Sequence, residues 1–276
     1  MPELPEVEST RRFLEPNIVG KRIMAAEVRR SRMVRRQPVE ADFVGRIMGR
    51  SVRSLTRHGK FMRTNLSGDV VWVTHLGMSG RISLAKTGEP EVAHTNVVVR
   101  FRGGLELRFV DPRTFGFVAA FTPGELADSP LGRLGPDVLD DAPDGGEMLA
   151  ALTGRTAPIK ALLLDQRIVA GLGNIYADEA LFRGGIDPNR PGGSLDLAEC
   201  SALSTAMQST MADGLAWSGT SLDDLAYLLP DGRAGEFAAR LAVYGREDEP
   251  CQNCGTPIRR TVLRQRSTHW CPSCQS

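Results

Sequence analysis

Four cysteines near the C-terminal end of the chain constrain its fold most. Cys251 and Cys254 form one CxxC pair, and after sixteen intervening residues Cys271 and Cys274 form a second. Two such pairs supply four thiolates to one tetrahedral Zn²⁺, and the segment between them can fold back as a hairpin. That segment, 255–270, holds four arginines and no acidic residue. We therefore expect one structural Zn²⁺ and a basic hairpin that contacts phosphate.

The charge of this chain is segregated along the sequence. The formal net charge is only +1, but residues 1–60 hold fourteen Lys/Arg against seven Asp/Glu. Residues 121–150 hold one arginine against seven acidic residues, and residues 251–276 hold four arginines and no acidic residue. Basic segments can therefore share one face while the acidic stretch points away, which favours a nucleic-acid partner.

Length and composition favour a multi-domain protein of the cytoplasm. The 276 residues give room for two domains and a small terminal module. The apolar runs are too short to span a bilayer, and the acidic, proline-containing start lacks the regions of a signal peptide. Four of the five cysteines have metal spacing, which indicates a reducing compartment. We expect no membrane partner.

The order of the sequence patterns predicts a multi-domain α+β fold. A helix over residues 5–16 precedes eight short apolar segments between residues 22 and 121, which predict an N-terminal β-sandwich. Proline, glycine and aspartate in 122–147 indicate a boundary, after which helical patterns prevail. The expected helices cover residues 145–152, 159–164, 175–183, 197–217 and 223–229. The expected domains are the sandwich, 1–130, a helical domain, 131–240, and a C-terminal zinc-ribbon hairpin, 241–276.

The N-terminal residues can supply a nucleophile. Removal of Met1 would leave Pro2 with a secondary amine whose pKa is about 8, so part of it is unprotonated at neutral pH. Attack of this amine on an aldehyde gives an iminium, whose fixed positive charge makes it an electron sink. Glu3 is adjacent and Glu6 lies three residues further on. Either carboxylate can move protons beside the amine.

Several loops have the residue types of a nucleic-acid contact. Gly171 and Gly173 precede Asn174 at a predicted helix start, where backbone amides favour phosphate, and Lys160 lies on the helix before it. Lys60 follows a glycine at the start of a predicted strand.

Two glycine-bounded turns follow predicted strands. Residues 75–80 contain Met78, and residues 111–116 contain Arg113 and Phe115. Apolar and aromatic side chains can enter a base stack, and an arginine can face an unpaired base.

Taken together, these segments resemble one known family over nearly the whole chain. The matching segments are residues 2–8, 59–60, 75–80, 111–116, 173–179 and the four-cysteine finger. They are similar to those of bacterial formamidopyrimidine-DNA glycosylases. The resemblance implies a monomeric base-excision-repair enzyme, both glycosylase and AP lyase. Its expected partner is damaged double-stranded DNA, from which it would excise oxidised purines (8-oxoguanine and formamidopyrimidines) and cut the strand by β,δ-elimination.

The resemblance also implies four catalytic residues. Pro2 would attack C1′ of the sugar and form the Schiff base. Glu3 would donate the proton that helps to open the sugar ring. Lys60 would assist β-elimination and hold a phosphate, and Arg266 would bind phosphate and assist δ-elimination.

Seven further residues are implied to contact DNA. Met78, Arg113 and Phe115 would fill the space left by the flipped nucleotide, with Arg113 reading the opposite cytosine. The other implied contacts are His94, Arg155, Lys160 and Asn174, of which the last two belong to a helix–two-turn–helix motif.

Two departures from the family pattern leave questions open. Residues 225–232, the expected loop over the damaged base, are unusually apolar, so the lesion preference is open. Thr156 stands where the family often has a basic residue, and Arg155 can serve instead.

Three alternatives to this interpretation stay open. The nearest is an endonuclease VIII-like glycosylase for oxidised pyrimidines, although such enzymes usually begin with Gly-Pro where this chain has Leu4 and Pro5. The others are a non-catalytic DNA-binding protein and an enzyme whose finger binds RNA or protein.

Overall fold

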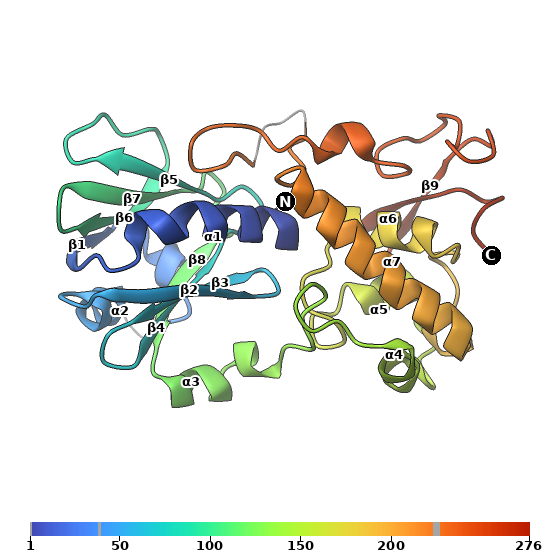
Figure 1. Cartoon of the computed structure of the whole chain (residues 1–276), viewed down its shortest axis with the longest axis horizontal. Helices are drawn as coiled ribbons and strands as arrows, with labels where there is room; N and C mark the ends of the chain where they lie inside the picture. Colours follow the sequence, from blue (N-terminus) through green and yellow to red (C-terminus); the bar gives the residue numbers. More distant parts are fainter. Residues whose placement is uncertain (1, 38–39, 223–226) are drawn as a thin grey trace. The chain divides into compact units, whose positions relative to one another are not determined.

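The computed structural model describes residues 2–37, 40–222 and 227–276 (Figure 1). The chain divides into two units. One consists of Met1–Arg133 and Trp217–Ala238, and the other of Leu134–Ala216 and Ala239–Ser276. The predicted domain limits at residues 130 and 240 stay a prediction.

Two four-stranded antiparallel sheets form the sandwich of the first unit. The first sheet has the order β1 (Ile23–Val28), β6 (Thr95–Phe101), β7 (Leu105–Val110) and β5 (Arg81–Lys86). The second has the order β2 (Val52–His58), β3 (Phe61–Leu66), β4 (Val70–His75) and β8 (Phe117–Phe121). Buried and half-buried residues alternate along β3, as expected for a strand with one face in a core. The predicted β-sandwich is confirmed.

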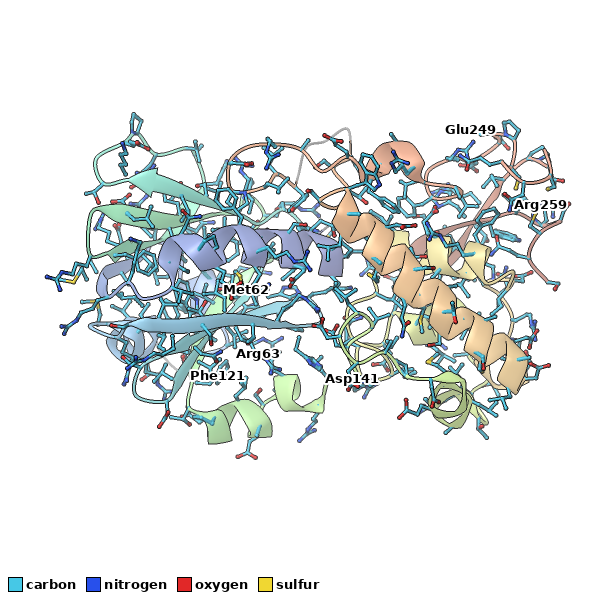
Figure 2. All side chains as sticks on the ribbon, in the orientation of Figure 1. Met62, Arg63, Phe121, Asp141, Glu249 and Arg259 are labelled. Atoms are coloured by element: carbon cyan, nitrogen blue, oxygen red, sulfur yellow. The ribbon has the colours of Figure 1, made fainter. Side chains whose placement is uncertain are left out.

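The core of this unit fixes the N-terminal helix. Leu4, Leu14 and Ile18 of α1 (Leu4–Ile18) are fully buried, at spacings that place them on one side of the helix. Leu14 and Ile18 share one apolar cluster with Trp72 and Met62, the latter labelled in Figure 2. Each such side chain contributes about 1.5–3 kcal/mol when buried. The packing of α1 therefore fixes the position of the residues just before it.

The sequence patterns missed the shorter helices of the first unit. These are η1 (Ser31–Val34), α2 (Glu40–Ile47), α3 (Pro123–Asp128) and η2 (Pro130–Arg133). α3 lies in the stretch expected to be a boundary. Its start is stabilised by a capping box in which Thr122 and Glu125 each accept the other's backbone N–H.

The second unit combines helices with the C-terminal hairpin. Its elements are α4 (Gly145–Leu152), α5 (Ile159–Leu163), α6 (Asn174–Arg183), η3 (Gly192–Ser194), α7 (Leu197–Ala216), η4 (Phe237–Arg240, shared with the first unit), β9 (Arg259–Leu263) and β10 (Arg266–Trp270). The four α-helices predicted between residues 145 and 217 are confirmed to within one residue at each end, and the helix predicted over residues 5–16 is confirmed as α1. Of the expected helix 223–229, residues 223–226 lie outside the described residues, and residues 227–229 are not helical.

The predicted hairpin at the C-terminal end is confirmed. β9 and β10 pair antiparallel, and Arg264 and Gln265 between them have φ of 44° and 65°. A two-residue turn with both φ positive has the twist that a tight hairpin needs. None of the helices in the described ranges combines the length and apolar character needed to cross a bilayer.

Candidate functional site

The Glu6 carboxylate binds the backbone on both sides of it, at Glu3 and at Thr220. Glu6 Oε2 accepts the backbone N–H of Glu3 at 2.7 Å, and Oε1 accepts that of Thr220 at 2.6 Å. Pro2 is buried, and Glu3 and Glu6 are each 1% exposed. The Glu3 side chain in turn accepts the Glu6 backbone N–H, so the two residues form a capping box at the start of α1.

Residues on both sides of 223–226 are anchored to α1. The Tyr227 hydroxyl donates to the Glu6 carbonyl at 3.2 Å, and Ser221 Oγ donates to the Tyr227 carbonyl at 2.7 Å. Burial raises the pKa of Tyr227, so the hydroxyl stays a donor. Gly219 has φ of +86°, and a Cβ there would lie 2.6 Å from Glu6 Oε1, so glycine is required. Of the expected lesion loop, 225–232, residues 225 and 226 lie outside the described residues.

Lys60 belongs to a positively charged cluster around His75. Lys60 lies in the turn between β2 and β3 and is 8% exposed. Burial, followed by the positive charges of Lys60, Arg35 and Arg36, lowers the pKa of His75 to about 3. His75 is therefore neutral at physiological pH, and its cationic neighbours favour an anionic group such as phosphate.

Aromatic contacts fix the His75 ring. Its centroid lies 4.8 Å from that of Phe61 and 5.5 Å from that of Phe117. His75 Nδ1 accepts the Gly77 N–H at 3.1 Å, which leaves the proton of the neutral ring on Nε2.

One buried carboxylate joins the two loops that contain Met78, Arg113 and Phe115. Asp111, which is 0% exposed, accepts Ser79 Oγ at 2.7 Å. It also accepts the N–H of Gly116 at 2.8 Å and that of Arg113 at 3.2 Å. The motifs that the sequence suggested for base-stack contacts therefore fold together around Asp111.

The expected DNA-contact residues of these loops are accessible. Arg113 is exposed, Met78 and Phe115 are half-buried, and the Arg113 guanidinium lies 4.9 Å from the centroid of the Phe115 ring. His94 is also exposed, and its carbonyl accepts the Asp111 N–H at 3.0 Å. Asp111 thus places Arg113, Phe115 and His94 in one region of the first unit.

In the second unit, Lys160 is buried against the C-terminal hairpin. Its Nζ lies 2.7 Å from Asp178 Oδ1 and donates to the Ser267 carbonyl at 2.6 Å and to Thr268 Oγ1 at 2.9 Å. The side chain of Lys160 is 1% exposed. The expected phosphate contact of Lys160 stays a prediction, but these bonds assign the ammonium a structural role that the sequence did not suggest.

Asn174 is bonded to Ser267, the hairpin residue that follows Arg266. Asn174 is the first residue of α6, and its Nδ2 donates to Ser267 Oγ at 3.3 Å. Arg266 is exposed at the start of β10, next to Ser267. Arg155 is exposed in the turn after α4, where its carbonyl accepts the Gly193 N–H at 2.8 Å.

Two acidic residues of α6 anchor the C-terminal part of this unit. Asp178 Oδ2 accepts the His269 N–H at 2.9 Å. Glu179 accepts the N–H groups of residues 242, 243 and 244, each at 2.9 Å. Burial raises the pKa of Glu179, and the three amide bonds partly oppose this shift. Both residues stand in the motif 173–179, yet nothing in the sequence shows their partners, which lie 63 to 91 residues away.

The four cysteines fit one zinc ion. The sulfur atoms of Cys251, Cys254, Cys271 and Cys274 all lie within 4.8 Å of one another. The Sγ distances are 3.9 Å between Cys251 and Cys274 and 3.5 Å between Cys254 and Cys271. A tetrahedron with Zn–S bonds of about 2.3 Å requires sulfur separations of about 3.8 Å. The four cysteines therefore fit one Zn²⁺, which confirms the prediction of a single structural zinc ion.

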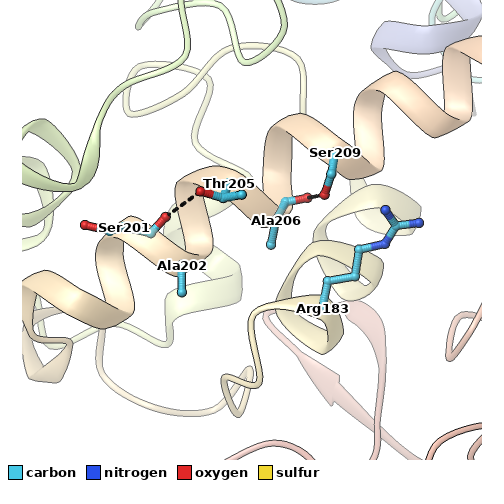
Figure 3. A pocket seen from close by; sticks show the side chains of 6 residues that line it. All are labelled: Arg183, Ser201, Ala202, Thr205, Ala206 and Ser209. Carbon is cyan, nitrogen blue, oxygen red and sulfur yellow. Dashed lines mark hydrogen bonds between the residues drawn. The ribbon is translucent and has the colours of Figure 1, made fainter.

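A hollow on α7 is separate from these residues (Figure 3). Small side chains and Arg183 of α6 line it. The Thr205 hydroxyl donates to the Ser201 carbonyl and the Ser209 hydroxyl to the Ala206 carbonyl, and Arg183 pairs with Asp213 at 2.7 Å. Because its polar groups bond within these helices, we assign no chemistry to this hollow.

Three family models match the chain. The formamidopyrimidine-DNA glycosylase N-terminal domain matches residues 1–118, and the formamidopyrimidine-DNA glycosylase H2TH domain matches residues 134–225. A zinc finger found in FPG and IleRS matches residues 248–276.

Curated proteins and solved structures are similar over the full length. Proteins named formamidopyrimidine-DNA glycosylase from Geobacillus kaustophilus and Methylococcus capsulatus are 43% and 41% identical, with 100% of each chain covered. The structure of the MutM (Fpg) protein from Thermus thermophilus matches with a TM-score of 0.89 at 40% identity, covering 99% of this chain and 98% of that one. The Lactococcus lactis Fpg, in complex with abasic-site DNA, matches with a TM-score of 0.91 at 31% identity over 100% of both chains.

Proposed function

Because this chain belongs to the formamidopyrimidine-DNA glycosylase family, as its motifs predicted, we propose that it excises oxidised purines from duplex DNA and then cuts the strand as an AP lyase. The relatives are named for formamidopyrimidine, and a structure of one holds DNA with an abasic site. The observation that supports the proposal most is the hydrogen bond from the Glu3 N–H to the buried Glu6 carboxylate, which fixes Glu3 and the adjoining Pro2 at the head of α1. We propose that the enzyme acts as a monomer in the cytoplasm.

The first chemical step needs an amine and a proton donor. Once Met1 is removed, the Pro2 nitrogen attacks C1′, and the bond from C1′ to the base breaks with its electron pair leaving on the base. The proton lost from the Pro2 amine neutralises the departing base. Glu3 donates a proton to the ring oxygen O4′, so the ring opens and the C1′–N bond becomes an iminium.

The iminium prepares the strand for cleavage. It acidifies the hydrogen at C2′, and loss of that proton expels the 3′ phosphate. A second elimination expels the 5′ phosphate. Lys60 and Arg266 would hold these phosphates and assist their departure as cations. The positive cluster that contains Lys60 supports this role for it.

DNA binding must expose the damaged base before this chemistry. Flipping a nucleotide out of a duplex costs about a few kcal/mol. Met78, Arg113 and Phe115 would fill the space left in the stack, with Arg113 facing the opposite cytosine. His94, Arg155, Asn174 and the hairpin arginines would hold phosphates. The Zn²⁺ supports the hairpin only, because four sulfurs leave no position on it for water.

Borohydride trapping tests the proposal. A duplex with 8-oxoguanine opposite cytosine should become covalently joined to the protein, and mass spectrometry should place the link on Pro2. Pro2→Gly should reduce the adduct sharply, whereas DNA binding should persist. A link on another amino group would overturn the mechanism, and faster release of thymine glycol than of 8-oxoguanine would overturn the substrate.

A further inference from the structure

A basic segment of the first unit is bonded to the loop that contains Arg113 and Phe115. Arg35 Nη1 donates to the Gly116 carbonyl and Nη2 to the Phe115 carbonyl, each at 2.6 Å. Arg32 Nε donates to the Thr114 carbonyl at 3.2 Å. Three successive carbonyls thus receive guanidinium donors from η1 and the residue after it.

The same arginines contact the rings of this region. The Arg32 guanidinium lies 5.9 Å from the centroid of Phe115, whose ring is also 4.9 Å from the Arg113 guanidinium. The Arg35 guanidinium lies 5.2 Å from the centroid of Phe117. Cation–π attraction at these distances orients the Phe115 ring as well as the backbone that bears it.

The backbone of this loop needs such support. Thr114 has φ of 51°, a left-handed conformation that is unfavourable for a β-branched residue. Asp111 holds the loop through the N–H groups of Arg113 and Gly116. Arg32 and Arg35 hold the carbonyls, so the two sets of bonds together restrict the loop to one conformation.

We propose that Arg32 and Arg35 are positioning residues, which hold Arg113 and Phe115 in the orientation needed to read the base opposite the lesion. This inference rests on the proposed function, because selectivity for the base opposite the lesion is part of that function. They act through the 111–116 loop rather than on the reacting sugar.

The competing role for these arginines is simple attraction of DNA phosphate. Lysine separates the two roles, because an ammonium keeps the positive charge but reproduces neither the two-carbonyl fork of Arg35 nor the Nε donor of Arg32. Arg36 supplies a matched control. It lies on the same segment, 5.4 Å from the Phe117 centroid, and among the described residues it donates no hydrogen bond to the loop carbonyls.

The experiment measures single-turnover release of 8-oxoguanine opposite cytosine and opposite adenine. Arg35→Lys and Arg32→Lys should each lower the cytosine-to-adenine rate ratio by about tenfold, the effect expected for a lost charge-assisted hydrogen bond. Arg36→Lys should leave the ratio unchanged. An unchanged ratio in both test variants, or an equal fall in all three, would overturn the inference. Arg32 and Arg35 are both exposed, so both variants should fold.

A second measurement is independent of catalysis. Hydrogen–deuterium exchange at the amides of Arg113 and Gly116 should be faster in Arg35→Lys than in the parent, and unchanged in Arg36→Lys. Equal exchange in all proteins would overturn the inference even if excision is normal. A parent protein that releases no 8-oxoguanine would instead overturn the proposed function, and the exchange result would still decide whether Arg35 positions the loop.

Discussion

His75 is a histidine that the fold keeps neutral. Burial and the charges of Lys60, Arg35 and Arg36 lower its pKa from 6.5 to about 3. Between these values the unfolded chain binds a proton that the folded chain does not. The contribution of His75 to stability is therefore complete above about pH 6.5 and is lost as the pH falls towards 3.

His75→Phe should make the acid sensitivity of folding smaller. Phenylalanine keeps a ring between Phe61 and Phe117 but cannot titrate. The decline in the free energy of unfolding between pH 6 and 4 should therefore become shallower by up to about 1.4 kcal/mol per pH unit. Urea denaturation at several pH values measures this. Parallel curves for the two proteins would contradict the assigned pKa.

Sequence motifs predicted which residues belong to the candidate site, but not their hydrogen-bond partners. The motifs suggested Met78, Arg113 and Phe115 as contacts for a base stack, and the structure places them on two loops joined by one carboxylate. The role of Asp111 could not be predicted, because its hydroxyl partner lies 32 residues away and a Ser–Asp bond has no sequence signature.

The ion pair of Lys160 and Asp178 fastens β10 to α5 and α6. Their Nζ and Oδ1 atoms lie 2.7 Å apart, with side chains 1% and 0% exposed. Lys160→Met should lower the free energy of unfolding by about 3–5 kcal/mol, because it leaves a buried carboxylate without its cation. Chemical denaturation measures this. A loss below about 1 kcal/mol would show that the pair does not anchor the hairpin.

The same variant distinguishes an anchor from a phosphate contact. DNA affinity falls with salt, and the slope of log K against log salt concentration measures the phosphate contacts. If Lys160 bound a phosphate directly, its loss would make this slope smaller by about one. An anchor should leave that slope unchanged. Arg155→Gln is the matched control, because this exposed arginine should alter the slope and not the stability.

Local sequence patterns predicted most helices and strands, but not how these elements pack on one another. Helical spacing and caps are short-range signals, so the four main helices of the second unit could be located to within one residue. The packing of β10 on α6 depends on bonds such as that from His269 to Asp178, which span 91 residues. The short helix α3 was missed because its six residues are rich in turn formers.

The metal and the charge distribution act on the chain as a whole. The net charge of +1 conceals a basic N-terminal region, a basic finger and an acidic stretch between them. The four Sγ atoms of the metal site come from two segments of the second unit. Cys251 and Cys271 also belong to a small apolar cluster with Ile258 and Phe182. The apolar cluster of the sandwich contains none of these residues. Loss of the metal should therefore unfold the finger and spare the sandwich.

Cys254→Ser should abolish zinc binding, DNA binding and strand cleavage together. A structural Zn²⁺ supplies about 10–16 kcal/mol to small finger peptides, so a finger with three sulfurs should not fold. Zinc analysis, a binding assay and borohydride trapping on one preparation measure the three losses. Cys200→Ala is the control, because this buried cysteine of α7 lies outside the cluster and should keep full zinc content. Cleavage that survives in zinc-free Cys254→Ser would mean that the finger is dispensable for catalysis.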